Sequence, residues 1–539
     1  MKNIEIPYEK DRGRRYRAFE ILPGAISWCL LVLPFILSLI NITAAVFFIL
    51  GYLLIYVARS AGVDIRALEG FHQTKVYQKL DWLQLARELE NRKIDNSIDI
   101  KRPKWHQENL QLITKHPTPM DKPSRLIHVA MIATYNESWE VLEPTVQAVL
   151  ASEYDVKKQV ILVLAYEERG GAATEAICQK LLAKYGQQFR YAMAVKHPKN
   201  MPGEVIGKGG NITYAGRELQ KYLAKKQIDP LRVIVTTLDS DNHPHPKYFG
   251  VLSYIYCLTP DPTKVSYQPI VMYTNNIWDA PAPMRVIATG NTLYDIVQTL
   301  RPHMLRNFSS HAQSMQALIE TDFWSVRTIV EDGHQFWRTY FRYGGQHEVY
   351  PLYIPIYQDA VLAKTYFKTL KAQFIQLRRW TWGASDIAYF ADKGFFTKNK
   401  IPRTDLIAKF FRLLETHVSW AVAPPLLLYA GFAPALISPK SYSANVLPLL
   451  ISHVQDAALI GALASVFICF KTLPPKPERY KKHRNILMLI QWILMPVTAL
   501  VYSAVAAIYS QTRLMFGRYL GAFDVTEKVV ITEDKQTIT

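Results

Sequence analysis

The amino-acid sequence predicts an α/β domain with a mostly parallel sheet, inserted between N-terminal and C-terminal transmembrane helices. Two observations carry this prediction. Segments without Asp, Glu, Lys or Arg lie near both ends of the chain, at 21–58, 416–439 and 485–512. Between them, over roughly 59–413, short strand-like apolar runs alternate with helix-like segments, an alternation typical of parallel sheets.

The first uncharged segment, 21–58, predicts two transmembrane helices that follow a basic cytosolic N-terminus, 1–20. One crossing of a bilayer needs about 20 apolar residues, so this segment has room for two crossings. Asn41 lies near its middle and is the expected turn. A cleaved signal peptide is excluded, because it would have a shorter apolar region. The remaining alternative is a buried helical hairpin of a soluble protein.

A helical linker is predicted over 59–124, because 77–93 has apolar residues at Leu80, Leu83, Leu85 and Leu89 with charges between them. The proline-rich stretch 115–123 marks its end. The α/β domain then occupies 125–395. Three of its apolar runs, 127–133, 159–164 and 231–238, read as strands that end in polar residues. Those polar ends are Thr134-Tyr135-Asn136-Glu137, Glu167-Glu168 and Asp239-Ser240-Asp241. Ligands bind at the carboxyl ends of strands in open α/β sheets, so the sequence predicts a binding site at this edge.

Two acidic pairs in this domain are candidate chemical groups. Asp239 and Asp241 supply hard oxygen ligands, which suit Mg²⁺ or Mn²⁺ bridging protein carboxylates and substrate phosphates. Their ordinary reading is a helix cap or a turn. Glu331 and Asp332 add a carboxylate that could deprotonate a hydroxyl, and their ordinary reading is a solvated helix end.

Phosphate and sugar contacts are predicted at two further places. The segment 203–211 is glycine-rich, but its spacing excludes a phosphate loop, which leaves Lys208 as a candidate partner of a diphosphate. Gln376 and Arg379 share one helix face. Arginine can hold a diphosphate bidentately, and the neighbouring Trp380 offers a flat face to a sugar ring. A basic helix with an anchoring tryptophan is the alternative for 376–380.

The C-terminal part of the chain predicts an interfacial helix, a transmembrane region and a cytosolic tail. These parts are 396–415, 416–512 (with helices 416–437, 446–470 and 485–512) and 513–539. Asp456 would line a glycan path or pair with a neighbouring helix. Pro496 allows 485–512 either to cross once or to fold back as a re-entrant hairpin.

Charge distribution sets the expected orientation and excludes several classes of protein. The 539 residues include 63 Lys+Arg and 45 Asp+Glu, a net charge of +18, with 12% aromatic residues, which excludes a disordered chain. Basic residues concentrate in 10–17 and 471–484, which places the α/β domain in the cytoplasm of a multi-pass plasma-membrane protein. No basic stripe is interleaved with aromatic residues, so we expect a lipid bilayer and no nucleic acid as partner. The four cysteines lie far apart, which excludes a disulfide scaffold.

Taken in order, these motifs resemble membrane-embedded glycosyltransferase family 2, in its cellulose-synthase and hyaluronan-synthase branch. The matching features are Thr134 to Glu137, Lys208 to Asn211, Asp239-x-Asp241, Glu331-Asp332, Gln376-x-x-Arg379-Trp380 and the tail Phe523 to Lys528, which looks like the family's gating segment. The resemblance implies a GT-A fold and an inverting hexosyltransferase. Its donor would be a nucleotide-diphosphate sugar and its acceptor a glycan or a lipid-linked sugar, with further membrane or export subunits as partners.

The resemblance also implies roles for individual residues. The nucleotide would be contacted by Thr134, Tyr135, Glu137 and Lys208, with Glu167 or Glu168 in place of the family's usual base-contacting Asp. The metal would be held by Asp239 and Asp241, and the general base would be Asp332. The diphosphate would be bound by Gln376 and Arg379, and Trp380 would face the acceptor sugar. Where processive members have an aromatic-Cys-Gly-rich acceptor segment, this chain has 308–314. A polysaccharide synthase is therefore predicted, with a single-addition enzyme on a lipid-linked acceptor, or a non-enzymatic transporter or receptor, as alternatives.

Overall fold

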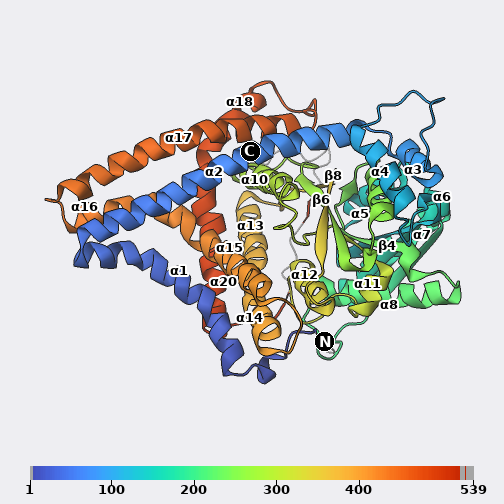
Figure 1. The fold of residues 1–539 in the computed structure, drawn as a ribbon, viewed down its shortest axis with the longest axis horizontal. Helices are drawn as coiled ribbons and strands as arrows, with labels where there is room; N and C mark the ends of the chain where they lie inside the picture. The colour runs from blue at the N-terminus through green and yellow to red at the C-terminus, as the bar shows by residue number, and fades with distance from the viewer. Residues whose placement is uncertain (1–3, 523–527, 530–539) are drawn as a thin grey trace.

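A mixed, mostly parallel sheet of eight strands forms the centre of the α/β domain (Figure 1). The computed structural model describes residues 4–522 and 528–529, apart from some side chains between 454 and 465. The strand order is β3-β2-β1-β4-β7-β6-β8-β5. The strands are β1 (Ile127–Thr134), β2 (Val160–Glu167), β3 (Tyr191–His197), β4 (Val233–Asp239), β5 (His243–Pro244), β6 (Val265–Tyr273), β7 (Ala312–Ser314) and β8 (Glu348–Gln358). The predicted fold class, a mostly parallel sheet between apolar helices at both ends of the chain, is confirmed.

The register of the parallel strands brings their carboxyl ends to one level. Ala133 of β1 pairs with Asp239 of β4, and Thr134 pairs with Tyr166, the residue before Glu167 in β2. β7 runs antiparallel to both of its neighbours, and β5 runs antiparallel to β8. The polar residues that end β1, β2 and β4 therefore lie side by side at one edge of the sheet.

Two apolar layers cover the sheet because successive side chains of each strand alternate between its faces. On one face, Ile132 and Leu164 pack against α5 (Trp139–Leu150) and α9 (Tyr248–Leu258). On the other, Met131 and Val163 pack against α8 (Lys208–Lys225) and α11 (Met315–Glu320). The remaining helices of this part are α3 (Trp82–Asn91), α4 (Lys104–Lys115), α6 (Val156–Gln159), α7 (Gly171–Tyr185), α10 (Ala282–Thr299), α12 (Glu331–Arg342), α13 (Tyr366–Thr381) and α14 (Asp386–Ala391).

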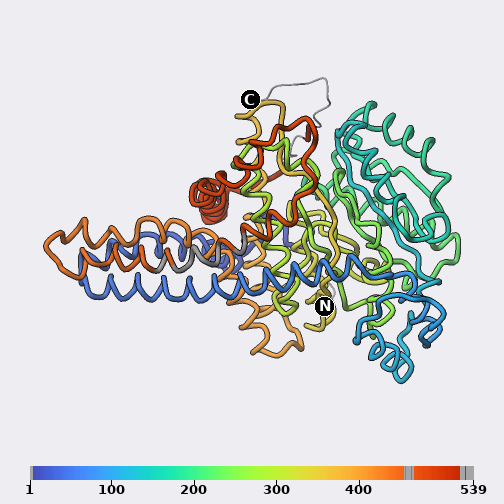
Figure 2. The backbone as a smooth tube through the Cα atoms, turned by 90° about the horizontal axis from the view of Figure 1, so that it is seen from above, coloured from blue at the N-terminus to red at the C-terminus, as the bar shows by residue number. Residues whose placement is uncertain are grey.

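Four helical segments of the described chain are long and apolar enough to cross a membrane: 14–40, 42–79, 403–437 and 483–515. They are built from α1 (Arg14–Ile40), α2 (Ile42–Lys79), α15 (Arg403–Tyr429) with α16 (Ala433–Ile437), and α18 (His483–Ile490) to α20 (Val505–Met515). The turn expected at Asn41 is confirmed, since Asn41 caps α2 by accepting from the backbone N–H of Ala44 at 3.1 Å. A further helix, α17 (Tyr442–Thr472), packs along α2, and Asp456 within it is exposed. Figure 2 shows α1, α2, α16 and α17 projecting together from the α/β domain.

Helical residues continue without a break from α18 through Pro496, in the short helix α19 (Met495–Thr498), into α20. Each end of this run is hydrogen-bonded to another helix. Near its start, Arg285 of α10 donates to the side chain of Gln491 at 2.6 Å. At its end, Arg17, near the start of α1, donates to the carbonyl of Met515 at 3.1 Å. In Figure 1 this run lies across the direction of α2 and α17.

The N-terminal segment is fixed to the α/β domain just before α1. Ile4 accepts a hydrogen bond from the Tyr389 hydroxyl at 2.6 Å, and Ile6 accepts one from Arg327 at 2.8 Å. Glu5 accepts from the Ser325 hydroxyl and pairs with Arg338 at 3.3 Å. This segment thus supports the loop that leads from Ser325 into α12.

Candidate active site

A cavity of about 120 Å³ opens at the carboxyl ends of β1, β2 and β4. Nine of the residues predicted from the sequence line it: Thr134, Tyr135, Glu137, Glu167, Lys208, Asp239, Asp241, Gln376 and Arg379. They come from three strands, α8 and α13, which are far apart in the sequence. Trp380 and Asp332 lie outside the lining.

Glu137 holds the turn that follows β1. Its Oε2 accepts from the Thr134 hydroxyl at 2.6 Å and from the backbone N–H groups of Tyr135 and Asn136 at 2.7 and 3.2 Å. A carboxylate with three such donors is held in one orientation. Gly170 lets the next loop approach this turn, because a Cβ at Gly170 would lie 1.7 Å from the Tyr135 carbonyl oxygen.

Glu167, at the end of β2, belongs to a buried charged cluster. Its Oε2 accepts from Arg169 Nε at 3.2 Å, forms an ion pair with Arg169 Nη2 at 3.0 Å and faces His197 Nδ1 at 3.2 Å. On the other side of the imidazole, Nε2 faces Glu204 Oε2 at 3.0 Å. Burial would lower the pKa of His197, but the hydrogen bonds to Glu167 and Glu204 outweigh burial and raise it to about 9. The imidazole is therefore protonated at neutral pH and holds both carboxylates.

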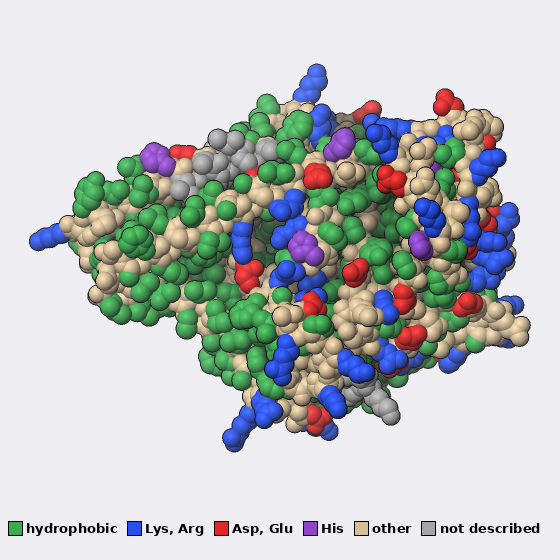
Figure 3. All heavy atoms as spheres, viewed as in Figure 1, with side chains coloured by type: hydrophobic (Ala, Val, Ile, Leu, Met, Phe, Trp, Pro, Cys, Tyr) green, Lys and Arg blue, Asp and Glu red, His purple; other side chains and the backbone are tan. Residues whose placement is uncertain are grey.

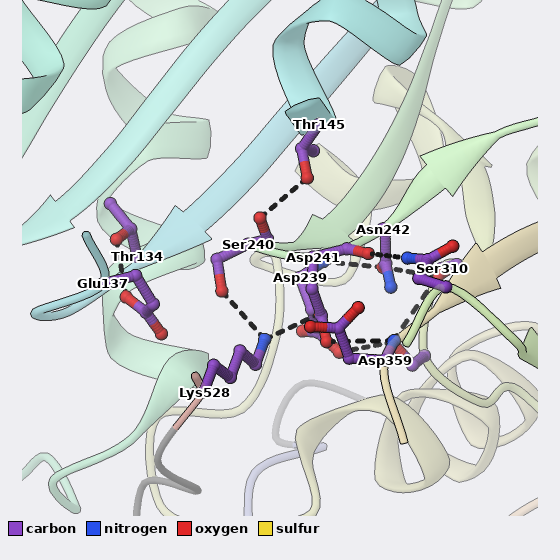
Figure 4. A network of polar contacts seen from close by, with 12 residues as sticks. Thr134, Glu137, Thr145, Asp239, Ser240, Asp241, Asn242, Ser310, Asp359 and Lys528 are labelled. Carbon is purple, nitrogen blue, oxygen red and sulfur yellow. Dashed lines mark hydrogen bonds and ion pairs between the residues drawn. The ribbon is translucent and has the colours of Figure 1, made fainter. Parts of the chain in front are cut away.

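Asp239, which ends β4, and Asp241 each face a lysine, and Figure 4 shows Lys528 beside them. Asp239 accepts from Lys208 Nζ at 2.6 Å and from the Ser309 hydroxyl at 2.7 Å. Burial raises the pKa of Asp239, but Lys208 and Lys528 lower it by more, so its carboxyl is ionised. Asp241 accepts from Lys528 Nζ at 2.7 Å.

The backbone between these aspartates is held from both sides. The Ser240 carbonyl accepts from the Thr145 hydroxyl at 2.7 Å, and the Ser240 hydroxyl accepts from Lys528 at 2.8 Å. The side-chain oxygen of Asn242 accepts from the Asp239 N–H at 2.7 Å and from the Ser310 hydroxyl at 2.8 Å. Hydrogen bonds to three other segments, at Thr145, Ser310 and Lys528, thus hold the turn that carries both carboxylates.

Asp359, which directly follows β8, is a third carboxylate at this place that the sequence reasoning missed. It lines the cavity, and its backbone N–H donates to Asp241 Oδ2 at 3.3 Å. Burial and repulsion from Asp241 raise the pKa of Asp359 to about 7. Its position directly after a strand could have indicated a site residue. The sequence of β8 alone, however, does not show that Asp359 lies beside the turn after β4.

The donor set fits a hard divalent cation that takes only some of its ligands from the protein. Within 4–522 and 528–529 no cluster of three or more His, Cys, Asp or Glu side chains is arranged to hold a metal ion by itself. Asp239 and Asp241 supply two carboxylates. Each of them pairs with a lysine ammonium group, so positive charge already neutralises these carboxylates in the folded chain. Such a site is completed by substrate phosphates and water.

Asp332 lies in the first turn of α12, beside the cavity. Its Oδ1 accepts from the backbone N–H of Gly333 at 2.7 Å. Burial raises the pKa of Asp332 and the nearby Asp239 adds to the rise, while Lys208 and Arg379 oppose it. The charges of the cavity thus act directly on this carboxyl. Glu331, next to it, is fully buried, and burial together with Asp332 raises its pKa as well.

The helix α13 directs Gln376 and Arg379 into the cavity from the side of the apolar helices. Gln376 accepts from the Gln373 side chain at 3.0 Å, which fixes its amide. Trp380 is partly buried and packs on Tyr273, with ring centroids 6.1 Å apart. Residues 523–527 of the predicted gating segment lie outside the described residues, but Lys528 pairs with Leu362 through a parallel β-bridge and reaches the aspartates.

Comparisons with known proteins find only remote likeness. No family model matches the chain, and no curated protein matches it. Among solved structures, the mannosyltransferase PcManGT from Pyrobaculum calidifontis, in complex with GDP-Man and Mn²⁺, is 14% identical over 84% of this chain and 99% of its own, with a TM-score of 0.37. TarS 1–349 from S. aureus is 10% identical over 73% and 93%, with a TM-score of 0.35. GalNAc-T7 with UDP, GalNAc and Mn²⁺ is 10% identical over 55% and 57%, with a TM-score of 0.30.

Proposed function

We propose that this protein is an inverting glycosyltransferase of the GT-A type that uses a nucleotide-diphosphate sugar to build a glycan at the membrane, as a polysaccharide synthase. One observation supports it above all others. Five separate segments bring carboxylates, lysine and arginine to a single cavity at the carboxyl edge of a parallel sheet. That combination suits a nucleotide whose diphosphate needs cations and whose base needs polar contacts.

The charges of the cavity suit a diphosphate leaving group. As the bond between the sugar and the diphosphate breaks, negative charge grows on the phosphate oxygens. Arg379 and Lys208 would stabilise that charge more in the transition state than in the bound donor. A Mg²⁺ or Mn²⁺ ion held by Asp239 and Asp241 would supply further positive charge to the same oxygens.

Asp332 would act as the general base. The acceptor hydroxyl oxygen would bond to the anomeric carbon as the carbon–diphosphate bond breaks, and the hydroxyl proton would move to the Asp332 carboxylate. A single displacement of this kind inverts the anomeric configuration. The raised pKa of Asp332 favours this role, because a base whose pKa lies nearer neutrality accepts a proton more readily. Trp380 would face the acceptor sugar.

The nucleotide would lie along the ends of β1 and β2. Thr134, Tyr135 and Glu137 would border it, and Glu167 would accept a hydrogen bond from the base. The ordered charges around Glu167 support this role, since His197 and Arg169 fix its carboxylate while it lines the cavity. Gln376 would join Arg379 at the diphosphate.

A second candidate function is a single sugar addition to a lipid-linked acceptor. The segment 308–314 favours it, because the hydroxyls of Ser309 and Ser310 support the aspartate turn where a processive enzyme would present an aromatic acceptor platform. Both functions place the α/β domain on the cytoplasmic face of the plasma membrane, between the apolar helices.

Release of nucleoside diphosphate tests the proposal. The purified full-length protein would be screened against nucleotide sugars with Mn²⁺, with Mg²⁺ and with a chelator, and Asp332→Asn would serve as the matched control. We expect metal-dependent release from one donor that the variant lacks. Equal release by the variant, or none from any donor, would contradict the proposal, and only short lipid-linked products would favour the second candidate.

A further inference from the structure

A cluster of positively charged side chains lies outside the active site, where α2, α15 and the loop after α10 meet. Its members, here called the arginine cluster, are Arg59, Arg66, Arg301, His303, Arg306 and Arg412. On the face drawn in Figure 3, Lys and Arg side chains gather around a hollow near the middle of the molecule, beside α2.

Three contacts bring these elements together. Gly70 of α2 lies against Ile296 of α10 so closely that a Cβ at Gly70 would be 2.8 Å from the Ile296 carbonyl oxygen. This packing runs α2 beside the end of α10, just before Arg301. Arg412 of α15 donates to the carbonyl of His303 at 3.0 Å. Arg59 of α2 pairs with Glu415 of α15, so α2 and α15 are also in direct contact with each other.

The positive charge of the cluster is poorly balanced by acids. Five arginines meet here. Glu415 pairs with Arg59, and Asp405 acts on Arg306 from a greater distance. Burial and the neighbouring Arg66 and Arg412 lower the pKa of Arg301. Burial and Arg412 likewise lower the pKa of Arg306 to about 10. The folded chain therefore holds like charges together at a cost that a bound anion would remove.

Arg306 is also held in a fixed position. Its guanidinium lies over the rings of Phe336 and Trp337 of α12, with 4.1 and 4.8 Å to the ring centroids. Its Nη1 donates to the carbonyl of Leu305 at 2.9 Å. A guanidinium that is already oriented loses less freedom when it binds an oxyanion.

The cluster lies where charged residues meet the apolar parts of the long helices. Arg59 is the first charge after the uncharged segment 21–58, and Arg412 precedes the uncharged segment that begins at residue 416. Large apolar side chains next to both are exposed: Leu54 by 71%, Ile55 by 58% and Phe411 by 63%. A soluble anion would leave these side chains in water, whereas acyl chains would cover them.

We propose that the arginine cluster binds the phosphate of an anionic phospholipid headgroup, with its acyl chains along the exposed apolar side chains of α2 and α15. Guanidinium groups match phosphate oxygens through paired hydrogen bonds. The cluster lies at the end of the apolar parts of α2 and α15, and this location sets the depth of the headgroup. The site is separate from the nucleotide cavity, so lipid binding does not depend on the proposed reaction.

The test is lipid binding by the full-length protein in a neutral detergent. The probe is phosphatidylglycerol, measured by native mass spectrometry and by the rise in melting temperature. The double variant is Arg66→Gln with Arg301→Gln. It is chosen because, within the part of the chain that the structure describes, neither side chain donates a hydrogen bond to another element; Arg66 donates to the carbonyl of Gly62 in its own helix at 2.7 Å. The matched control is Lys481→Gln with Lys482→Gln, which removes the same charge from two exposed lysines of the 471–484 loop.

We expect the double variant to bind phosphatidylglycerol about tenfold more weakly than the native protein, and the control to bind it as the native protein does. Without lipid, the double variant should melt at or above the native temperature, because it removes repulsion. Phosphatidylcholine and inorganic phosphate should each give little protection. If the lysine control lost as much phosphatidylglycerol affinity as the double variant, the lipid would be bound by diffuse surface charge. If inorganic phosphate raised the melting temperature as much as phosphatidylglycerol does, the cluster would be a site for a soluble anion. Either result would overturn the proposal.

Discussion

Replacement of His197 by glutamine should destabilise the protein in a manner that depends on pH. His197 lies between Glu167 and Glu204, and its pKa is raised from 6.5 to about 9. That difference corresponds to about 3 kcal/mol of stabilisation when the imidazole is protonated. Because the pKa in the folded protein exceeds that in the unfolded chain, this stabilisation is complete below pH 6.5, falls as the pH rises and is lost above pH 9. At pH 7.5 about 2 kcal/mol remains.

The assay is thermal unfolding of the full-length protein in neutral detergent, followed by tryptophan fluorescence from pH 6 to pH 10. The native protein should melt several degrees above His197→Gln near pH 6.5, and the two curves should approach one another by pH 9.5. His116→Gln is the matched control, since His116 is exposed and should leave the curve unchanged at every pH. If the difference in melting temperature between the native protein and His197→Gln were as large at pH 9.5 as at pH 6.5, His197 would stabilise the protein by packing alone. The charge of the imidazole would then not be the cause.

Three further changes test the site. Asp332→Asn should lower turnover by about 10²- to 10⁴-fold while nucleoside-diphosphate affinity, measured by calorimetry, stays the same; a large loss of affinity would instead indicate a binding role. Gly210→Ala places a Cβ 2.6 Å from Glu204 Oε2, so it should lower the melting temperature, and an unchanged value would show that this carboxylate moves freely. Lys528→Met removes the ammonium group from Asp241, so Mn²⁺ should bind severalfold more tightly without donor; weaker binding would show that the lysine does not compete with the cation.

The sequence could predict the site residues whose position depends only on the strand that they end. The apolar runs before Thr134, Glu167 and Asp239 identify buried strands, and parallel strands place their carboxyl ends together whatever the details of packing. Local pattern was therefore enough to bring these residues to one edge, and the cavity contains all three.

The residues that were missed depend on which strands become neighbours. His197 ends β3, and its importance comes from the pairing of β3 with β2, which brings it to Glu167. Asp359 directly follows β8, and β8 pairs with β5, which lies just after the Asp241 turn. Neither pairing follows from hydrophobic periodicity, because strand order is decided by the packing of the whole domain.

The two ends of the described chain meet on the same α/β domain, and this sets an order for its biosynthesis. Glu5 contacts Ser325 and Arg338, whereas Lys528 contacts Asp241. The ribosome makes the aspartate turn nearly 300 residues before it makes Lys528. In a nascent chain the carboxylates of Asp239 and Asp241 thus lack that lysine until the four described segments that could cross a membrane have been synthesised. The contact between Lys528 and Asp241 can therefore form only after the helices from α1 to α20 have been translated.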